Sequence, residues 1–125
     1  MGNPIVEAVA AVNKKTRPVY LYDVPQSVPG DIRCVGLVEL TSEDELDATK
    51  RARGDTMRLA FELAKQSLVE VNEKPVTQAD GSVDSAWDKM GAQVRNLVLT
   101  AYAKLHAPSE GVAEGFLKSQ RVRVT

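Results

Sequence analysis

The chain has 125 residues, of which 43% are hydrophobic and 26% are charged, a size and mix typical of one folded domain and not of a disordered chain. Sixteen Lys and Arg residues stand against seventeen Asp and Glu residues, so no overall basic field draws in nucleic acid or an anionic membrane. The single cysteine, Cys34, excludes an internal disulfide and favours a reducing compartment. Since no apolar run approaches the roughly eighteen residues of a membrane-spanning helix, we expect a cytoplasmic protein.

The N-terminal residues have the pattern of a short helix. Asn3 can cap it and Pro4 suits its first turn, and its apolar residues share one face: Ile5, Val9 and Val12. We expect residues 1–16 to form this helix and a linker, and residues 17–125 to form a helical core with two β-hairpins. The whole chain, residues 1–125, is then one domain.

Two segments predict β-hairpins. In the first, β-branched and aromatic residues at 18–24 and again at 32–40 flank the turn residues PQSVPGD. In the second, LVEVNEKPV at 68–76 alternates apolar and polar residues and turns through Asn72 and Glu73. The short length of the second segment, together with its proline, favours a small hairpin at the edge of a sheet.

Two helices are expected between these hairpins. The first begins at Thr41 or Ser42, with acidic residues three positions later for a capping box, and ends near Arg53. Asp55 caps the second helix, at 56–67. An apolar stripe at helical spacing follows Met57, Ala60, Phe61 and Ala64, and Leu59 and Leu63 widen it to one side.

The rest of the chain predicts three more helices, at 83–90, 94–105 and 112–117, and residues 121–125 have the composition of a strand. The strongest apolar stripe is in the helix at 94–105, so we expect Leu97, Val98 and Trp87 to be buried in one core. The predicted fold class is α+β, mainly helical, with about five helices and two small β-hairpins in one domain.

Two residues are candidates for chemistry. His106 is the only histidine, and its place near the end of a helix suits the helix dipole better than a metal site, since no second His and no Cys is near it in the sequence. Cys34 has no histidine close in sequence and is typical of a small packed residue, not a nucleophile. An approach of His106 to Cys34 in space stays open.

Three charged or glycine-rich segments have structural interpretations. The acidic run Glu43, Asp44, Glu45 and Asp47 stabilises a helix start, and divalent metal binding is the alternative, although the spacing is not that of a calcium loop. GVAEG at 111–115 lacks the Lys-Ser or Lys-Thr of a phosphate loop. The basic C-terminus, with Lys118, Arg121 and Arg123, has no interleaved aromatic residues, which favours a partner-facing tail over nucleic-acid binding. We therefore expect a binding protein without enzymatic activity or cofactor.

Three consecutive patterns resemble the tail assembly chaperones of tailed bacteriophages and prophages. They are the acidic helix start followed by a second helix at 41–67, the LVEVNEKPV hairpin after it, and the helix at 94–106 that runs into EGFLKSQRVRV. The resemblance covers residues 30–124 and consists of the type and order of elements. One departure is the turn Asn72-Glu73, where a glycine-containing turn is more familiar.

The resemblance implies a small assembly factor in the host cytoplasm that binds the tape measure protein and keeps it soluble while the tail tube polymerises around it. It implies no cofactor and no nucleic-acid or membrane partner; the tail tube and other tail proteins are further partners, and a homo-oligomer stays open. The alternative is a structural virion subunit, such as a neck, tail-terminator or baseplate component. A phage-encoded regulator is a more distant third.

Four leucine and phenylalanine residues are the candidates for partner binding: Leu59, Leu63, Phe116 and Leu117. The first two widen a stripe that its neighbours can cover only in part, and the last two lie close to a chain end with little sequence left to cover them. A contiguous exposed apolar patch usually marks an interaction site. In the alternative interpretation, the helices at 56–67 and 112–117 dock on each other and bury all four.

Overall fold

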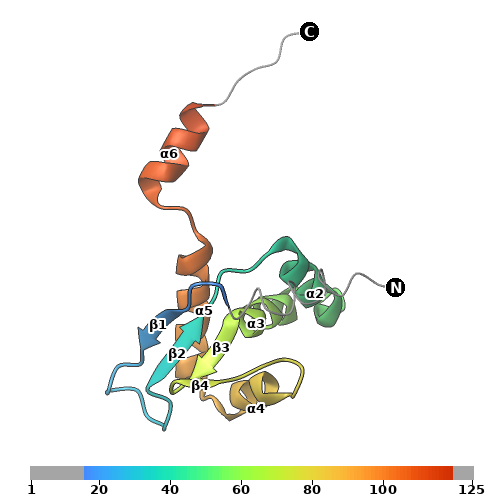
Figure 1. Cartoon of the computed structure of the whole chain (residues 1–125), viewed down its shortest axis with the longest axis vertical. Helices are drawn as coiled ribbons and strands as arrows, with labels where there is room; N and C mark the ends of the chain where they lie inside the picture. Colours follow the sequence, from blue (N-terminus) through green and yellow to red (C-terminus); the bar gives the residue numbers. More distant parts are fainter. Residues whose placement is uncertain (1–15, 120–125) are drawn as a thin grey trace.

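The computed structural model describes residues 16–119, apart from the side chain of Phe116. The elements in this range are β1 (Tyr20–Asp23), β2 (Cys34–Leu37), α2 (Ser42–Ala52), α3 (Thr56–Ser67), β3 (Leu68–Val71), β4 (Lys74–Pro75), α4 (Ser82–Lys89), α5 (Ala92–His106) and α6 (Glu110–Lys118). The described part is α+β and mainly helical, as predicted (Figure 1). The helix expected before residue 16 and the strand composition of residues 121–125 concern residues outside this range.

Both predicted hairpins form, but they join into one four-stranded antiparallel sheet with the order β1-β2-β3-β4. The pairing of β2 with β3, in which Val35 lies opposite Val71 and Leu37 opposite Leu68, spans the two helices between them. β3 is thus an inner strand and β4 an edge strand, so the second hairpin lies at an edge of the sheet, as predicted, and is paired with the first hairpin through β2. Burial of Leu37 and Leu68, both almost fully inaccessible, favours this long-range register.

The turn of the second hairpin holds two residues in the left-handed region. Asn72 and Glu73 have φ of 52° and 67°, as a two-residue type I′ turn requires. The Asn72 side-chain oxygen accepts hydrogen bonds from the backbone N–H of Arg33 at 2.7 Å and of Cys34 at 3.2 Å. Its amide nitrogen donates to the carbonyl oxygen of Asp31 at 3.0 Å. Asn72 therefore holds the chain entering β2 against the β3-β4 turn.

The predicted helix caps of α2 and α3 are confirmed. Thr41 caps α2 through a capping box, in which its backbone N–H donates to the Asp44 carboxylate at 3.0 Å and its hydroxyl accepts from the Asp44 N–H at 3.3 Å. The Asp55 carboxylate accepts from the N–H groups of Met57 and Arg58 at the start of α3. The two helices pack against each other, and Ala48 and Ala52 of α2 are buried.

The hydrophobic core lies between one face of the sheet and α5, which runs behind the sheet in Figure 1, and α3 and α4 close it at the side. The rings of Phe61 and Trp87 meet there with centroids 5.7 Å apart. The buried residues of this core are Val24, Val28, Val35, Leu37, Ala64, Leu68, Trp87, Met90, Val94, Val98 and Ala101.

The expectation for α5 is partly wrong. Val98 and Trp87 are buried in one core as predicted, but the Leu97 side chain is 37% exposed. Successive residues of a helix point about 100° apart, and the sheet and α3 meet the face of α5 that carries Val94, Val98 and Ala101. Leu97 therefore lies at the border of the buried face.

The apolar stripe predicted for α3 packs only in its second half. Met57 is 71% exposed and Ala60 is also exposed, whereas Phe61 and Ala64 lie in or against the core. Exposure changes along this helix more than around it, because α2, α4 and α5 all contact α3 and enclose its C-terminal half. That enclosure is close enough to bury the side chain of Glu62.

Candidate interaction surfaces

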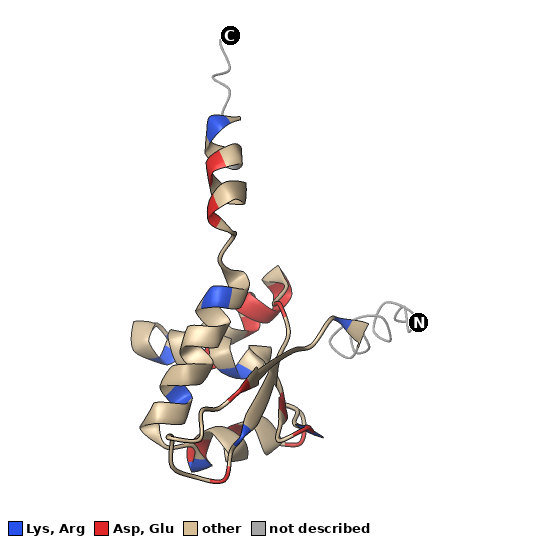
Figure 2. Cartoon of the chain, turned by 90° about the vertical axis from the view of Figure 1, so that its left-hand side faces the viewer, with Lys and Arg blue, Asp and Glu red and all other residues tan. Residues whose placement is uncertain are grey.

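The residues predicted to bind a partner lie on two separate parts of the molecule. Leu59 and Leu63 are half-buried on α3, within the body. Leu117 lies on α6 and is 66% exposed, and the side chain of Phe116 is outside the described part of the structure. Because α6 extends away from the body in both views (Figures 1 and 2), the structure does not bring the two pairs into one patch.

Helix α6 presents apolar side chains to solvent. Val112 is 64% exposed and Leu117 is 66% exposed. At helical spacing, the apolar residues of α6 occupy one side of the helix, and the opposite side carries Gly111, Glu114 and Lys118. Val112 was not among the predicted binding residues, although its spacing of four from Phe116 already placed both on one face.

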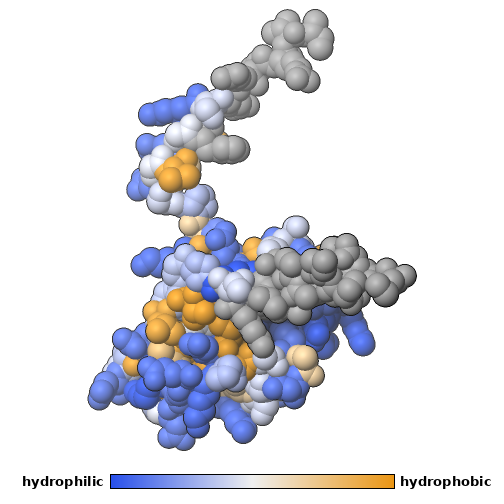
Figure 3. All heavy atoms as spheres, viewed as in Figure 1, coloured by the Kyte–Doolittle hydropathy of each residue, from blue (hydrophilic) through white to orange (hydrophobic). Residues whose placement is uncertain are grey.

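A second apolar surface covers the outer face of the sheet, visible in Figure 3 in the region of β1 and β2. Its exposed members include Val19 at 38% and Leu21 at 57%. Gly36 lies opposite Leu21, and a Cβ there would come within 2.9 Å of the Val19 side chain, so the glycine leaves room for the Val19 side chain over β2. The sequence did not reveal this surface because the run 18–24 alternates too weakly to show which side faces the core.

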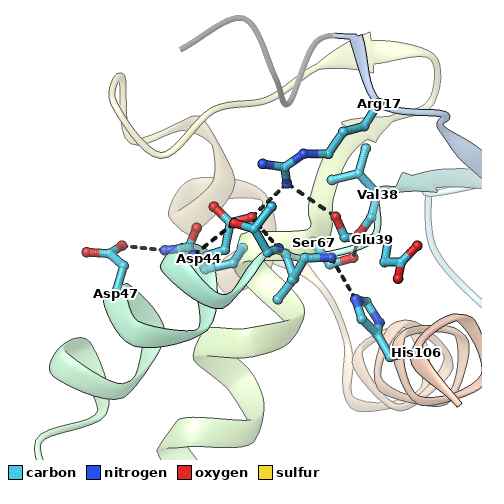
Figure 4. A network of polar contacts seen from close by, with 10 residues as sticks. Arg17, Val38, Glu39, Asp44, Asp47, Ser67 and His106 are labelled. Carbon is cyan, nitrogen blue, oxygen red and sulfur yellow. Dashed lines mark hydrogen bonds and ion pairs between the residues drawn. The ribbon is translucent and has the colours of Figure 1, made fainter. Parts of the chain in front are cut away.

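His106 has a structural role. Its Nε2 accepts a hydrogen bond from the backbone N–H of Leu40 at 2.9 Å (Figure 4). Its Nδ1 lies 2.8 Å from the carbonyl oxygen of Tyr102. These two contacts define the neutral tautomer with the proton on Nδ1. The ring also lies against that of Tyr102, with centroids 4.3 Å apart and planes tilted by 35°. His106 therefore ties the end of α5 to the segment that leads into α2.

Arg17 extends this network from the other side. One guanidinium nitrogen lies 2.6 Å from the Asp44 carboxylate and donates to the carbonyl oxygen of Glu39 at 3.2 Å (Figure 4). The Ser67 hydroxyl donates to the carbonyl oxygen of Val38 at 2.5 Å. Of the predicted acidic run, Asp44 thus caps α2 and pairs with Arg17, and these contacts tie the start of α2 to the segment before β1.

Cys34 is half-buried, and its environment does not activate it. Burial raises the pKa of its thiol, and the charges of Asp23, Glu73 and Glu70 raise it further. The thiol is therefore protonated at neutral pH and is a poor nucleophile. The thiol contacts the carbonyl oxygen of Val35. The ring nitrogens of His106 contact Leu40 and Tyr102, so the structure does not pair His106 with Cys34.

Within residues 16–119, no cluster of three or more His, Cys, Asp or Glu side chains has the arrangement of a metal site. In the same range, no helix combines the length and apolar character needed to cross a membrane. Comparisons of the chain with protein-family models, with curated proteins and with solved structures find no match.

Proposed function

We propose that this chain is a tail assembly chaperone of a tailed bacteriophage or prophage, which binds the tape measure protein in the host cytoplasm and keeps it soluble while the tail tube assembles. The order of elements that carries the resemblance at residues 41–106 supports the proposal. It has a capped helix pair, a small hairpin and a long helix, all three of which form in the structure. The function requires no reaction, and the proposal assigns none.

The observation that carries the proposal is the exposed apolar side of α6. A nine-residue helix that stands away from the body has little tertiary packing to stabilise it, since most helical stability in proteins comes from burying an apolar face. Val112 and Leu117 remain about two-thirds exposed. A partner that covers this side would stabilise both the helix and the complex.

The partner that fits such a surface is an amphipathic helix. Two helices pack through apolar residues at spacings of three and four, and α6 offers this spacing over two turns. A protein that exposes long amphipathic helices before assembly would aggregate through the same residues. Transient cover by α6 would therefore keep a tape measure protein soluble and would release it when the tube supplies a larger interface.

Co-expression tests the proposed function. The tape measure gene of the same phage is expressed alone and together with this chain, and the soluble and insoluble fractions are compared. We expect the tape measure protein to move from the insoluble to the soluble fraction only when the chain is present, and to co-purify with it. No change in its solubility would contradict the chaperone function.

Mass spectrometry of purified tails separates the chaperone from the structural subunit. A chaperone is absent from finished tails, whereas a neck, tail-terminator or baseplate subunit is present at a fixed ratio to the tube protein. The position of the gene gives an independent indication, because a chaperone gene is expected immediately before a very long open reading frame.

A further inference from the structure

A hollow of about 530 Å³ lies between the α2-α3 turn and α4, and every residue that lines it is charged. Five of these residues are basic and three are acidic: Lys50, Arg51, Arg53, Arg58, Lys65, Glu62, Asp84 and Asp88. An interior this polar is unsuited to an apolar side chain. Its ligand must therefore be recognised through charge and hydrogen bonds.

We call the acidic residues of the lining its acidic wall and the basic residues its basic wall; the two meet on α3, where Arg58 and Glu62 lie one turn apart. The acidic wall consists of Glu62 on α3 and of Asp84 and Asp88 on α4, and Lys65 is committed to it, with its ammonium 2.9 Å from both the Glu62 and the Asp84 carboxylates. Burial lowers the pKa of Lys65, but its hydrogen bonds to Glu62 and Asp84 outweigh this effect and raise the pKa overall. Lys65 therefore stays charged and neutralises part of the negative charge of the acidic wall.

Only some of the cations in the basic wall have an ion-pair partner among the described residues. Arg51 is paired with Asp47 at 3.0 Å, one turn earlier on α2. Lys50, Arg53 and Arg58 make no ion pair with any residue in the part of the chain that the structure describes. Three of the five cations that line the hollow thus have no ion pair within the described residues.

The helix dipole accounts for the charge of Lys50 but not for that of Arg58. Lys50 lies in the last turn of α2, where a cation suits the helix dipole. Arg58 is in the first turn of α3, where the same dipole disfavours a positive charge. Arg53 has φ of 51° and ψ of 41°, a left-handed conformation that glycine adopts with less strain. The charge of Arg58 and the backbone conformation of Arg53 thus oppose local stability, whereas the charge of Arg53 suits the C-terminal end of α2.

We propose that this hollow binds an acidic peptide segment of a partner protein. Carboxylates of the peptide pair with Lys50, Arg53 and Arg58, and its backbone N–H groups face the acceptors of Asp84 and Asp88. A nucleic acid fits less well, because a phosphodiester has no donor for the acidic wall and no aromatic residue lines the hollow for base stacking. This surface is distinct from α6, so the proposal does not depend on the proposed function.

Fluorescence anisotropy with a fluorescein-labelled octaglutamate peptide tests the proposal. We expect the unmodified protein to bind the peptide at low ionic strength and to lose it progressively as salt screens the charges. The double variant Arg53→Glu and Arg58→Glu should weaken binding by about tenfold or more. The matched control, Lys74→Glu with Lys104→Glu, makes the same change in net charge at exposed positions elsewhere and should retain affinity within about twofold.

The variant Arg53→Gly separates binding from folding. Glycine accepts the left-handed conformation, so we expect weaker peptide binding without a lower melting temperature. Three outcomes would overturn the proposal. They are no binding of the peptide by the unmodified protein, an equal loss of peptide affinity in the Lys74→Glu, Lys104→Glu control, and tighter binding of a labelled oligothymidylate than of the peptide. If the double glutamate variant fails to fold, its place in the binding measurement is taken by Arg53→Gly combined with Arg58→Gln, since neither change introduces a charge. This variant should also bind the peptide more weakly than the unmodified protein does.

Discussion

The Asn72-Glu73 turn shows how single side chains determine the second hairpin. Both residues are in the left-handed region, which asparagine tolerates and glutamate does not favour. Asn72 compensates through its three hydrogen bonds to residues 31–34. The sequence indicated a turn here, but only the structure shows that Asn72 joins two segments some forty positions apart, since no local pattern encodes such a contact.

Glu73→Gly should stabilise the protein by about 0.5–1 kcal/mol, because glycine relieves the strained backbone of the second turn position. Chemical denaturation of both proteins under the same conditions measures the difference. Asn72→Ala is the opposite control, and the loss of three hydrogen bonds should destabilise the protein by roughly 1–3 kcal/mol. A Glu73→Gly variant that is less stable than the parent protein would show that the turn is not under strain.

Asp80 makes the stability of the protein depend on acid pH. Hydrogen bonds from the side chain and then the backbone N–H of Ser82 lower the pKa of Asp80 below its ordinary value of 3.8. The contribution of the charged form is therefore present above pH 3.8 and is lost as the pH falls through the lower, folded-state value. Asp80→Asn should remove the part of the stability loss in acid that comes from protonation of Asp80. The melting temperature of this variant should therefore fall less steeply below pH 4 than that of the parent protein. Equal slopes would refute this assignment.

At the scale of elements, local signals placed the helices and both hairpins close to where they lie. Caps at Thr41 and Asp55 are short-range features, so the sequence alone could predict them. The pairing of β2 with β3 could not be predicted in the same way, because about thirty residues separate the strands and the register depends on core packing. The same holds for the exposure of Leu97, which depends on which neighbours α5 meets.

The α5 helix supplies a direct comparison of two adjacent residues. Val98 is fully buried, so Val98→Ala should destabilise the protein by roughly 2–3 kcal/mol through lost apolar burial and the cavity that remains. Leu97→Ala removes a larger side chain, but one that is 37% exposed, and should destabilise it by only about 0.5–1 kcal/mol. Equilibrium unfolding of the two variants measures both values. The reverse order would mean that α5 is rotated relative to the sheet.

At the scale of the whole molecule, α6 stands apart from a body built of the sheet and helices α2 to α5 (Figures 1 and 2). The interpretation in which α3 and α6 dock on each other is not what the structure shows, since Leu117 is two-thirds exposed. The sequence identified the apolar residues of both helices, but not that they lie on separate surfaces. Spacing along one helix shows which residues share a face, and carries no information on whether another element covers it.

The central claim is that the apolar side of α6 binds the tape measure protein, and one pair of variants tests it most directly. Leu117→Asp places a charge on that side, and Gly111→Asp places the same charge on the opposite side, where a new side chain meets no neighbouring atom within 4 Å. Both variants are co-expressed with the tape measure protein, and the amount that co-purifies is measured alongside the melting temperature of each variant alone. We predict unchanged melting temperatures for both, loss of the partner with Leu117→Asp and retention with Gly111→Asp. A folded Leu117→Asp variant that retains the partner as well as Gly111→Asp does would contradict the claim.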